Sequence, residues 1–182
     1  MYMKATGIVR RIDDLGRVVI PKEIRRTLRI KEGAPLEIYT DGNGEVIFKK
    51  YLPMGELVNL AVLYTEVLYK VSGMPIIISD SEHIVAVSGV PKRDYLERRL
   101  SPVIDEFMET RRSFVARDGQ LGEIHPVEGL DGTAAVMYPI ISSGDVMGSV
   151  IMLFGENKSM PTETEIKLVQ SAAVFLGKQM EE

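Results

Sequence analysis

The first fifty residues alternate between apolar and polar positions at a short period. Residues 6–12 and 17–20 are rich in β-branched side chains, and a second pair of such runs, 36–40 and 46–49, flanks the turn sequence DGNG. Alternation of this kind predicts short strands, and DGNG predicts a hairpin between the second pair. Four short strands in so few residues predict a small, mostly β unit.

One short helix is predicted between the two pairs of strands. Pro21 suits the first turn of a helix, and KEIRRTL places Ile24 and Leu28 four residues apart on one face. A unit of about fifty residues buries little apolar surface and often needs a second chain for stability. We therefore expect a dimer in which interleaved hairpins cover the strand edges.

A second, larger domain is predicted over residues 54–182, after a first domain of residues 1–53, because YLPMGE at the junction contains a proline and a glycine. It opens with a helix over 56–73 that ends at a glycine. It closes with a helix over 162–180 that begins with the capping box TETE.

Between these helices, apolar runs bounded by turn residues predict five strands and two helices. The strands are expected at 75–80, 84–89 and 113–117 and in two long runs around SSGD within 133–155, and the helices at 94–101 and 101–112. The order helix, two strands, helices, strands, helix is typical of an α+β domain with a central antiparallel sheet flanked by helices.

Both long helices carry more apolar residues than a single sheet can cover. One stripe is expected to face the sheet and the other to be left in water, the second consisting of Leu57, Tyr64, Leu68, Val71, Val169, Leu176 and Met180. An exposed apolar patch usually marks an interface, so two copies are expected to form a four-helix bundle. Together with the dimer of the first domain, this predicts a homotetramer. The alternative is that the helices cover opposite sides of one monomeric domain.

Charge is unevenly distributed along the chain. Residues 1–50 hold 11 of the 22 Lys and Arg but only 7 of the 26 Asp and Glu, a net charge of +4, so the rest carries −8. Six cations lie within seventeen residues, namely Arg10, Arg11, Arg17, Lys22, Arg25 and Arg26. A guanidinium can bind a phosphate or the edge of a guanine, so double-stranded DNA is the expected partner. The alternative is an ordinary solvated basic surface.

The composition offers little catalytic chemistry. There is no cysteine, and the two histidines, His83 and His125, fall in a predicted turn and a predicted loop, so no metal site is expected. Neither a G-x-S-x-G elbow nor a G-K-[ST] phosphate loop occurs. No run approaches the roughly 18 apolar residues of a membrane span. We expect a soluble intracellular protein that is not an enzyme and has no cofactor and no membrane partner.

Residues 6–51 resemble the swapped-hairpin DNA-binding domain of the AbrB-type transition-state regulators. The motifs G-I-V-R, D-x-L-G-R-V-V-I-P, E-I-R-R-T-L and a closing I-x-K-K carry the resemblance along its whole length. It implies a dimeric β-barrel whose strands exchange between chains, with DNA contacts from Arg10, Arg17, Arg25 and Arg26. It implies neither a metal nor catalysis in this domain.

Residues 54–182 resemble a GAF domain, a sensory fold, chiefly through AVMYPIISSGDVMGSVIMLF. The resemblance implies that this domain senses a small molecule or mediates oligomerisation. We expect a pocket over the sheet, lined from the 83–96 and 118–132 connections, where binding groups tend to lie. The candidate ligand contacts are Arg93, Arg98, Arg99 and His125. The alternatives are an exposed basic face for the arginines and an ordinary surface histidine for His125.

The two domains in this order resemble the sporulation regulators of spore-forming bacteria. This implies a cytoplasmic, nucleoid-associated transcription factor that activates and represses sporulation genes, in the forespore. The competing hypothesis is an antitoxin-like DNA-binding module with a toxin-binding C-terminal domain. Antitoxins of that type usually carry a short disordered tail, and the strand-rich second domain argues against it.

Overall fold

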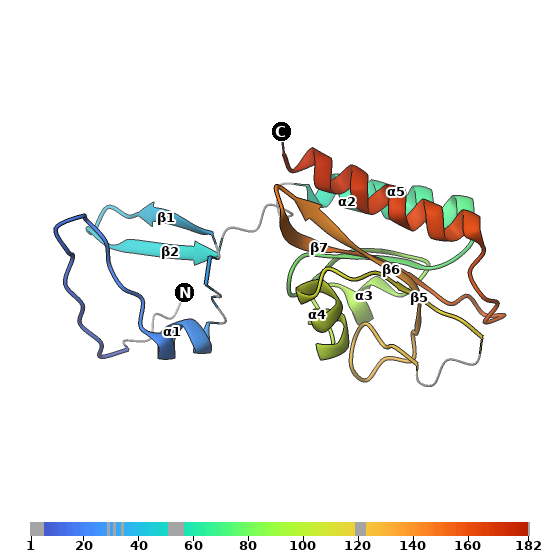
Figure 1. Cartoon of the computed structure of the whole chain (residues 1–182), viewed down its shortest axis with the longest axis horizontal. Helices are drawn as coiled ribbons and strands as arrows, with labels where there is room; N and C mark the ends of the chain where they lie inside the picture. The colour runs from blue at the N-terminus through green and yellow to red at the C-terminus, as the bar shows by residue number, and fades with distance from the viewer. Residues whose placement is uncertain are drawn as a thin grey trace. The chain divides into compact units, whose positions relative to one another are not determined.

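The chain divides into two compact units, Met1–Tyr51 and Leu52–Glu182 (Figure 1). The computed structural model describes residues 6–28, 30, 32–33, 35–50, 57–118 and 123–181. The predicted domain boundary after residue 53 lies outside the described residues.

The described residues of the N-terminal unit form one helix and one hairpin. The helix is α1 (Lys22–Thr27), and the hairpin joins β1 (Leu36–Thr40) to β2 (Val46–Lys50). The two strands pair antiparallel across the DGNG turn, as the sequence predicts. The Asp41 carboxylate fixes this turn because it accepts hydrogen bonds from two backbone N–H groups within it.

The strands predicted at residues 6–12 and 17–20 are not formed in the single chain. A strand requires a hydrogen-bonded neighbour, and a single chain does not supply one for these segments. No described residue of the N-terminal unit is buried, and Val9, Ile12 and Val19 are 88%, 69% and 72% exposed. The prediction of strands is therefore wrong for the isolated chain.

The larger unit is built on one five-stranded antiparallel sheet, in the order β4-β3-β7-β6-β5 (Figure 1). This confirms the predicted α+β class with antiparallel sheets. The strands are β3 (Ile76–Ser79), β4 (Ile84–Ser88), β5 (Phe114–Val115), β6 (Ala134–Ser142) and β7 (Asp145–Leu153).

Two long helices, α2 (Val58–Ser72) and α5 (Glu163–Gln179), cover one face of this sheet, and two short ones, α3 (Lys92–Tyr95) and α4 (Pro102–Glu109), cover the other (Figure 1). The predicted caps are present, since Gly73 ends α2 in the left-handed region and the capping box opens α5. In the described part of the chain no helix has the length and apolar character needed to cross a membrane.

The helix predicted over 94–101 is mostly absent. It ends at Tyr95, and the residues that follow hydrogen-bond to the segment around β4 instead. The backbone N–H of Ile84 donates to the Arg98 carbonyl, and that of Leu100 donates to the Glu82 carbonyl. Pairing with a neighbouring strand therefore outweighs the local helical pattern.

Side chains of the sheet alternate between two cores. Ile76 and Ile78 pack with α2 and α5, whereas Ile77 packs with Ile104 and Met108 of α4 on the opposite face. A sheet buried on both faces needs apolar residues at successive positions, which explains the uninterrupted apolar runs of β3, β6 and β7.

The apolar stripe predicted to lie in water is largely part of the domain's own core. Leu68, Val169 and Leu176 are buried between the helices and the sheet, so their predicted exposure is wrong. The reason is that α2 and α5 lie side by side on the same face and turn these residues toward it. Leu57, Tyr64 and Met180 are half-buried against the same core, and Val71 alone is exposed, at 65%.

Candidate nucleic-acid interface

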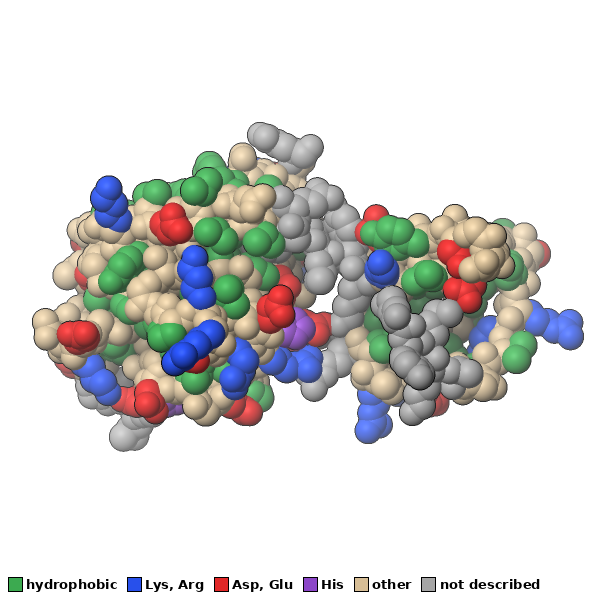
Figure 2. Space-filling model, turned by 180° about the vertical axis from the view of Figure 1, so that it is seen from behind, with side chains coloured by type: hydrophobic (Ala, Val, Ile, Leu, Met, Phe, Trp, Pro, Cys, Tyr) green, Lys and Arg blue, Asp and Glu red, His purple; other side chains and the backbone are tan. Residues whose placement is uncertain are grey.

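The six candidate DNA contacts come from two neighbouring parts of the N-terminal unit. Three of them, Arg10, Arg11 and Arg17, flank the turn at residues 13–16, and the other three lie on α1. All six are exposed except Arg25, which is half-buried. Figure 2 shows Lys and Arg side chains that project from the surface of this unit.

Asp13 holds the turn and orients Arg17. One carboxylate oxygen accepts from the backbone N–H of Leu15 (3.0 Å) and of Arg17 (2.8 Å), and the other accepts from Arg17 Nε at 2.9 Å. The backbone and then the side chain of Arg17 hold the pKa of Asp13 below its usual range. The Arg17 side chain nevertheless remains 70% exposed, so its guanidinium is both oriented and accessible.

The role of Asp13 was not predicted from the sequence, where Asp13 stands only as the first residue of the motif D-x-L-G-R-V-V-I-P. An aspartate at the start of a turn often accepts a hydrogen bond from the backbone N–H two residues later, which forms an Asx turn. Asp13, two residues before Leu15, is placed for such a bond.

Arg25 and Arg26 point in different directions because neighbouring helical residues lie about 100° apart. Arg26 is exposed, whereas Arg25 Nε is buried and has no hydrogen-bond partner among the described residues. A buried donor without an acceptor is costly, by about 1–3 kcal/mol. The Nε of Arg25 is therefore left without an acceptor in the single chain.

The four candidate ligand contacts of the larger unit line neither of the two cavities described below. Arg93 forms an ion pair with Asp94, and Arg99 forms one with Glu82, both at 3.3 Å. Arg98 is exposed. His125 Nε2 lies 3.9 Å from a carboxylate oxygen of Glu123, and its Nδ1 is buried without a partner in the described structure.

One cavity lies beside the predicted 118–132 connection. It has a volume of about 230 Å³ and is lined by Phe114, Ala116, Arg117, Glu123, Ile124, Thr133, Ala134, Phe154, Lys158 and Met160. Lys158 Nζ and a Glu123 carboxylate oxygen, 3.2 Å apart, form an ion pair at this cavity. Neither His125 nor the three candidate arginines line it. Within the described ranges there is also no cluster of three or more side chains suited to a metal ion.

Comparison with known protein families gives two matches. Residues 56–181 match the family described as stage V sporulation protein T C-terminal, transcription factor. Residues 9–52 match the family described as antidote-toxin recognition MazE, bacterial antitoxin. The two matched segments correspond closely to the two compact units.

Similar proteins and structures agree with this division. The GAF domain from a phosphoenolpyruvate-protein phosphotransferase of Coxiella burnetii superimposes with a TM-score of 0.54 at 17% identity, covering 68% of this chain and 82% of that chain. This likeness shows that the larger unit has the GAF fold. The transition state regulatory protein AbrB of Bacillus subtilis (strain 168) is 62% identical over 53 residues, covering 29% of this chain and 54% of AbrB.

A third relative matches along both units. Stage V sporulation protein T of Bacillus subtilis (strain 168) is 48% identical over 182 residues, covering 99% of this chain and the whole of that protein. Because this identity is continuous and the larger unit matches the family's own C-terminal domain, the chain belongs to the stage V sporulation protein T family.

Proposed function

We propose that this protein is a transcription factor that binds double-stranded DNA through its N-terminal unit and activates or represses sporulation genes. It acts in the cytoplasm, at the nucleoid, and in the forespore. The observation that carries the proposal is the cluster of six cations, five of them exposed, in a unit of net charge +4, within a chain that belongs to a family of transcription factors. The proposal requires no cofactor and no catalysis.

The arrangement of the cations suits a phosphate backbone. Arginine binds phosphate through a planar fork of donors, and a fork that is already oriented loses less freedom on binding. Arg17 has such an orientation because Asp13 holds its Nε. Arg25 is half-buried, so it offers less of its side chain to a phosphate oxygen or a base edge than the exposed Arg26.

The N-terminal unit is proposed to form a dimeric barrel by exchanging strands between chains. Three observations support this arrangement. No described residue of residues 6–50 is buried, the segments 6–12 and 17–20 have no strand neighbour, and the unit is 62% identical to part of AbrB. A second chain would provide both the missing strand partners and the missing core, and it would double the set of cations.

The larger unit is proposed to sense a small molecule or to join two such dimers into a tetramer. Its GAF fold supports the first role. The second is supported by the outward face of α2, where Leu63, Val67 and Val71 recur every four residues at 60%, 55% and 65% exposure. We therefore propose this face of α2 as the interface, in place of the stripe predicted from the sequence, whose residues Leu68, Val169 and Leu176 are buried.

The experiment is a titration of a DNA duplex with the full-length protein at several salt concentrations. If about five to eight cations of a dimer meet phosphates, the logarithm of the affinity should fall with the logarithm of the salt concentration at a slope of roughly −4 to −7. Arg17→Ala and Arg26→Ala should each weaken binding and make the slope shallower by roughly 1 to 2, since a dimer loses two contacts.

Arg93→Ala is the matched control, because Arg93 is an exposed arginine of the larger unit, paired with Asp94. It should leave both the affinity and the slope unchanged. A slope near zero for the unmodified protein, or equal affinities for all three variants, would exclude binding through these cations.

The antitoxin hypothesis is favoured by the match of residues 9–52 to the MazE family. In that case the chain would bind a small toxin, and the toxin would be recovered with it from its own cells. The folded GAF unit occupies the part of the chain where antitoxins of this type carry a disordered tail, which favours the transcription factor.

A further inference from the structure

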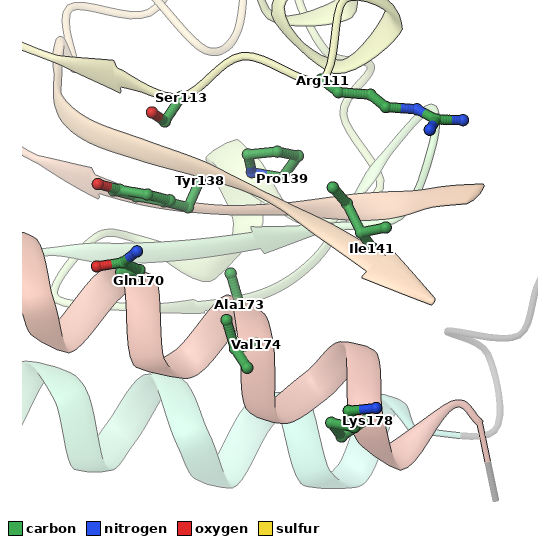
Figure 3. A pocket seen from close by; sticks show the side chains of 9 residues that line it. All are labelled: Arg111, Ser113, Tyr138, Pro139, Ile141, Gln170, Ala173, Val174 and Lys178. Atoms are coloured by element: carbon green, nitrogen blue, oxygen red, sulfur yellow. The ribbon is translucent and has the colours of Figure 1, made fainter. Parts of the chain in front are cut away.

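A cavity of about 300 Å³ opens at the outer edge of the GAF sheet, apart from the cavity beside residues 118–132 (Figure 3). Its walls are β6, α5 and the turn that follows α4. A volume of this size is at the lower end of the range for small-molecule sites. None of the candidate ligand contacts predicted from the sequence lies in it.

Polar, apolar and cationic side chains line different parts of the cavity. Figure 3 shows Ser113, Tyr138 and Gln170 toward one end and the cations Arg111 and Lys178 toward the other. The surface between them is apolar and includes Pro139, Ile141 and Val174. None of the nine lining residues is acidic, although the larger unit as a whole carries an excess of acidic residues.

Arg111 occupies a backbone position that usually belongs to glycine. The N–H of Arg111 donates to the Met108 carbonyl, and the N–H of Arg112 donates to the Phe107 carbonyl, which is the hydrogen-bond pattern of a helix C-terminal Schellman motif. The motif places Arg111 in the left-handed region, at φ 55. Glycine adopts this conformation without strain, whereas other residues are disfavoured there. Arg111 therefore adopts a backbone conformation that is disfavoured for an arginine, and its exposed side chain extends outward from the rim of the cavity (Figure 3).

The guanidinium of Arg111 is also available for a ligand, since it has no ion pair within the described part of the chain. Lys178 is different, because its Nζ lies 2.6 Å from a Glu181 carboxylate oxygen. The other oxygen of that carboxylate accepts from the backbone N–H of Ser143. The positive charge of Lys178 is thus already compensated, and an anion would be bound mainly by Arg111.

The open edge of β6 does not favour a peptide strand as the occupant. β5 pairs with Val136 and Met137, and the backbone of Ala134 and Ala135 is also hydrogen-bonded on that side, so only the part of β6 after Met137 has no strand neighbour there among the described residues. Pro139 is opposite Ser149 of β7, whose N–H donates to Ser79 of β3. The pair of Pro139 and Ser149 is therefore not hydrogen-bonded, and Pro139 turns toward the open edge, where it has no N–H to offer.

We propose that this cavity binds a small organic anion, a carboxylate or a phosphate monoester, that carries a short apolar body. The anionic group is bound by the Arg111 guanidinium, and the apolar body lies along Ile141 and Val174. The hydroxyl groups of Ser113 and Tyr138 and the amide of Gln170 are available for polar groups at the far end. This inference concerns the GAF unit alone and does not rest on DNA binding.

The test measures binding of hexanoate, hexyl phosphate and hexanol to the full-length protein by isothermal titration calorimetry. At least one of the two anions should bind, and hexanol should bind roughly tenfold or more weakly, because a hydrogen bond to a charged group is lost. Binding of one anion and not the other identifies the anionic group. Failure of both anions to bind, or equal binding of hexanol, would overturn the proposal.

Arg111→Gly is the decisive variant, because glycine removes the guanidinium and suits the left-handed backbone better than arginine. It should weaken anion binding roughly tenfold to a hundredfold, while the melting temperature stays the same or rises. Glu97→Gly is the matched control, since Glu97 is also in the left-handed region, at φ 60, and lies outside the cavity. It should leave the affinity unchanged. Unchanged anion affinity in Arg111→Gly, or an equal loss in Glu97→Gly, would show that Arg111 does not bind the ligand.

Discussion

Asp13 shows how a single acidic residue organises a cationic surface. Its carboxylate accepts two backbone hydrogen bonds within the turn and one from the Arg17 side chain, so it fixes both the turn and the guanidinium. The exposed pair itself contributes little to stability. Its effect is on geometry, because it limits the directions in which Arg17 can point.

This geometry predicts an unusual titration of Asp13. The hydrogen bonds from Arg17 lower the pKa of Asp13 in the folded state. A lowered folded pKa means that the contribution to stability is present above the unfolded pKa, which is about 3.9. That contribution is lost as the pH falls through the lower folded value. The turn should therefore stay intact down to below about pH 4.

The midpoint can be measured from the Asp13 carboxyl carbon by NMR. Arg17→Gln should raise the midpoint, because the charged partner is removed while the backbone hydrogen bonds remain. Arg11→Gln, a change of the same kind at a neighbouring exposed arginine, should leave it unaltered. A midpoint at the ordinary value in the unmodified protein would contradict the proposed role of Asp13.

For single residues, the sequence predicts which side chains are candidates for binding, but it does not predict where each of them lies in the fold. The cations near Arg17 stand out by composition and by resemblance to AbrB-type domains. Arg111 could not be found in this way, because the pattern of residues 101–112 reads as one continuous helix. The helix ends at Glu109 in a motif that usually contains glycine, and no glycine marks it in the sequence.

Among the elements, those fixed by local chemistry are predicted well. The DGNG hairpin, the capping box of α5 and the glycine cap of α2 each depend on a few consecutive residues. The strands at residues 6–12 and 17–20 fail in the single chain because their partners would come from elsewhere. The choice of the buried stripe on α2 fails for a related reason. Both of its faces are apolar, and only packing decides that Leu68 is buried and Leu63 is exposed.

The contact between α5 and β6 depends on Gly177. A Cβ at this position would collide with the carbonyl oxygen of Ile141, so the helix backbone rests directly on the strand. Ile141, and Lys178 next to Gly177, also line the cavity between α5 and β6. A glycine within a helix is otherwise unfavourable by about 1 kcal/mol relative to alanine.

Gly177→Ala should therefore destabilise the GAF unit, although helix propensity alone predicts a gain. Overpacking of a close contact typically costs about 1–3 kcal/mol in the free energy of unfolding, and chemical denaturation measures it. Ser171→Ala, at an exposed position of the same helix, is the control and should be neutral or slightly stabilising. If Gly177→Ala raised the stability as much as Ser171→Ala does, the close contact would not exist in solution.

For the whole molecule, the two units present two separate apolar surfaces. The N-terminal unit exposes Val9, Ile12 and Val19, which a strand-exchanged partner would cover. The GAF unit exposes the outward face of α2, and Phe175 of α5 joins that face by stacking on Tyr64, with ring centroids 5.2 Å apart. Two independent twofold contacts on one chain close most simply as a tetramer.

Val67→Glu should therefore convert the proposed tetramer into a dimer, as measured by light scattering, without unfolding the chain. Val67 is 55% exposed, so a carboxylate there remains solvated in the dissociated state, whereas the proposed helix bundle would bury it unpaired. The strand-exchanged dimer of the N-terminal units would persist, because its surface is untouched.

The matched control is Val103→Glu, which places the same charge at a valine that is 45% exposed on α4, against the other face of the sheet. It should leave the mass unchanged. A Val67→Glu variant that keeps both its fold and the mass of the unmodified protein would exclude this face of α2 as the interface. Loss of the tetramer should also weaken binding to a DNA fragment that carries two sites, because two linked DNA-binding units raise the effective concentration of the second.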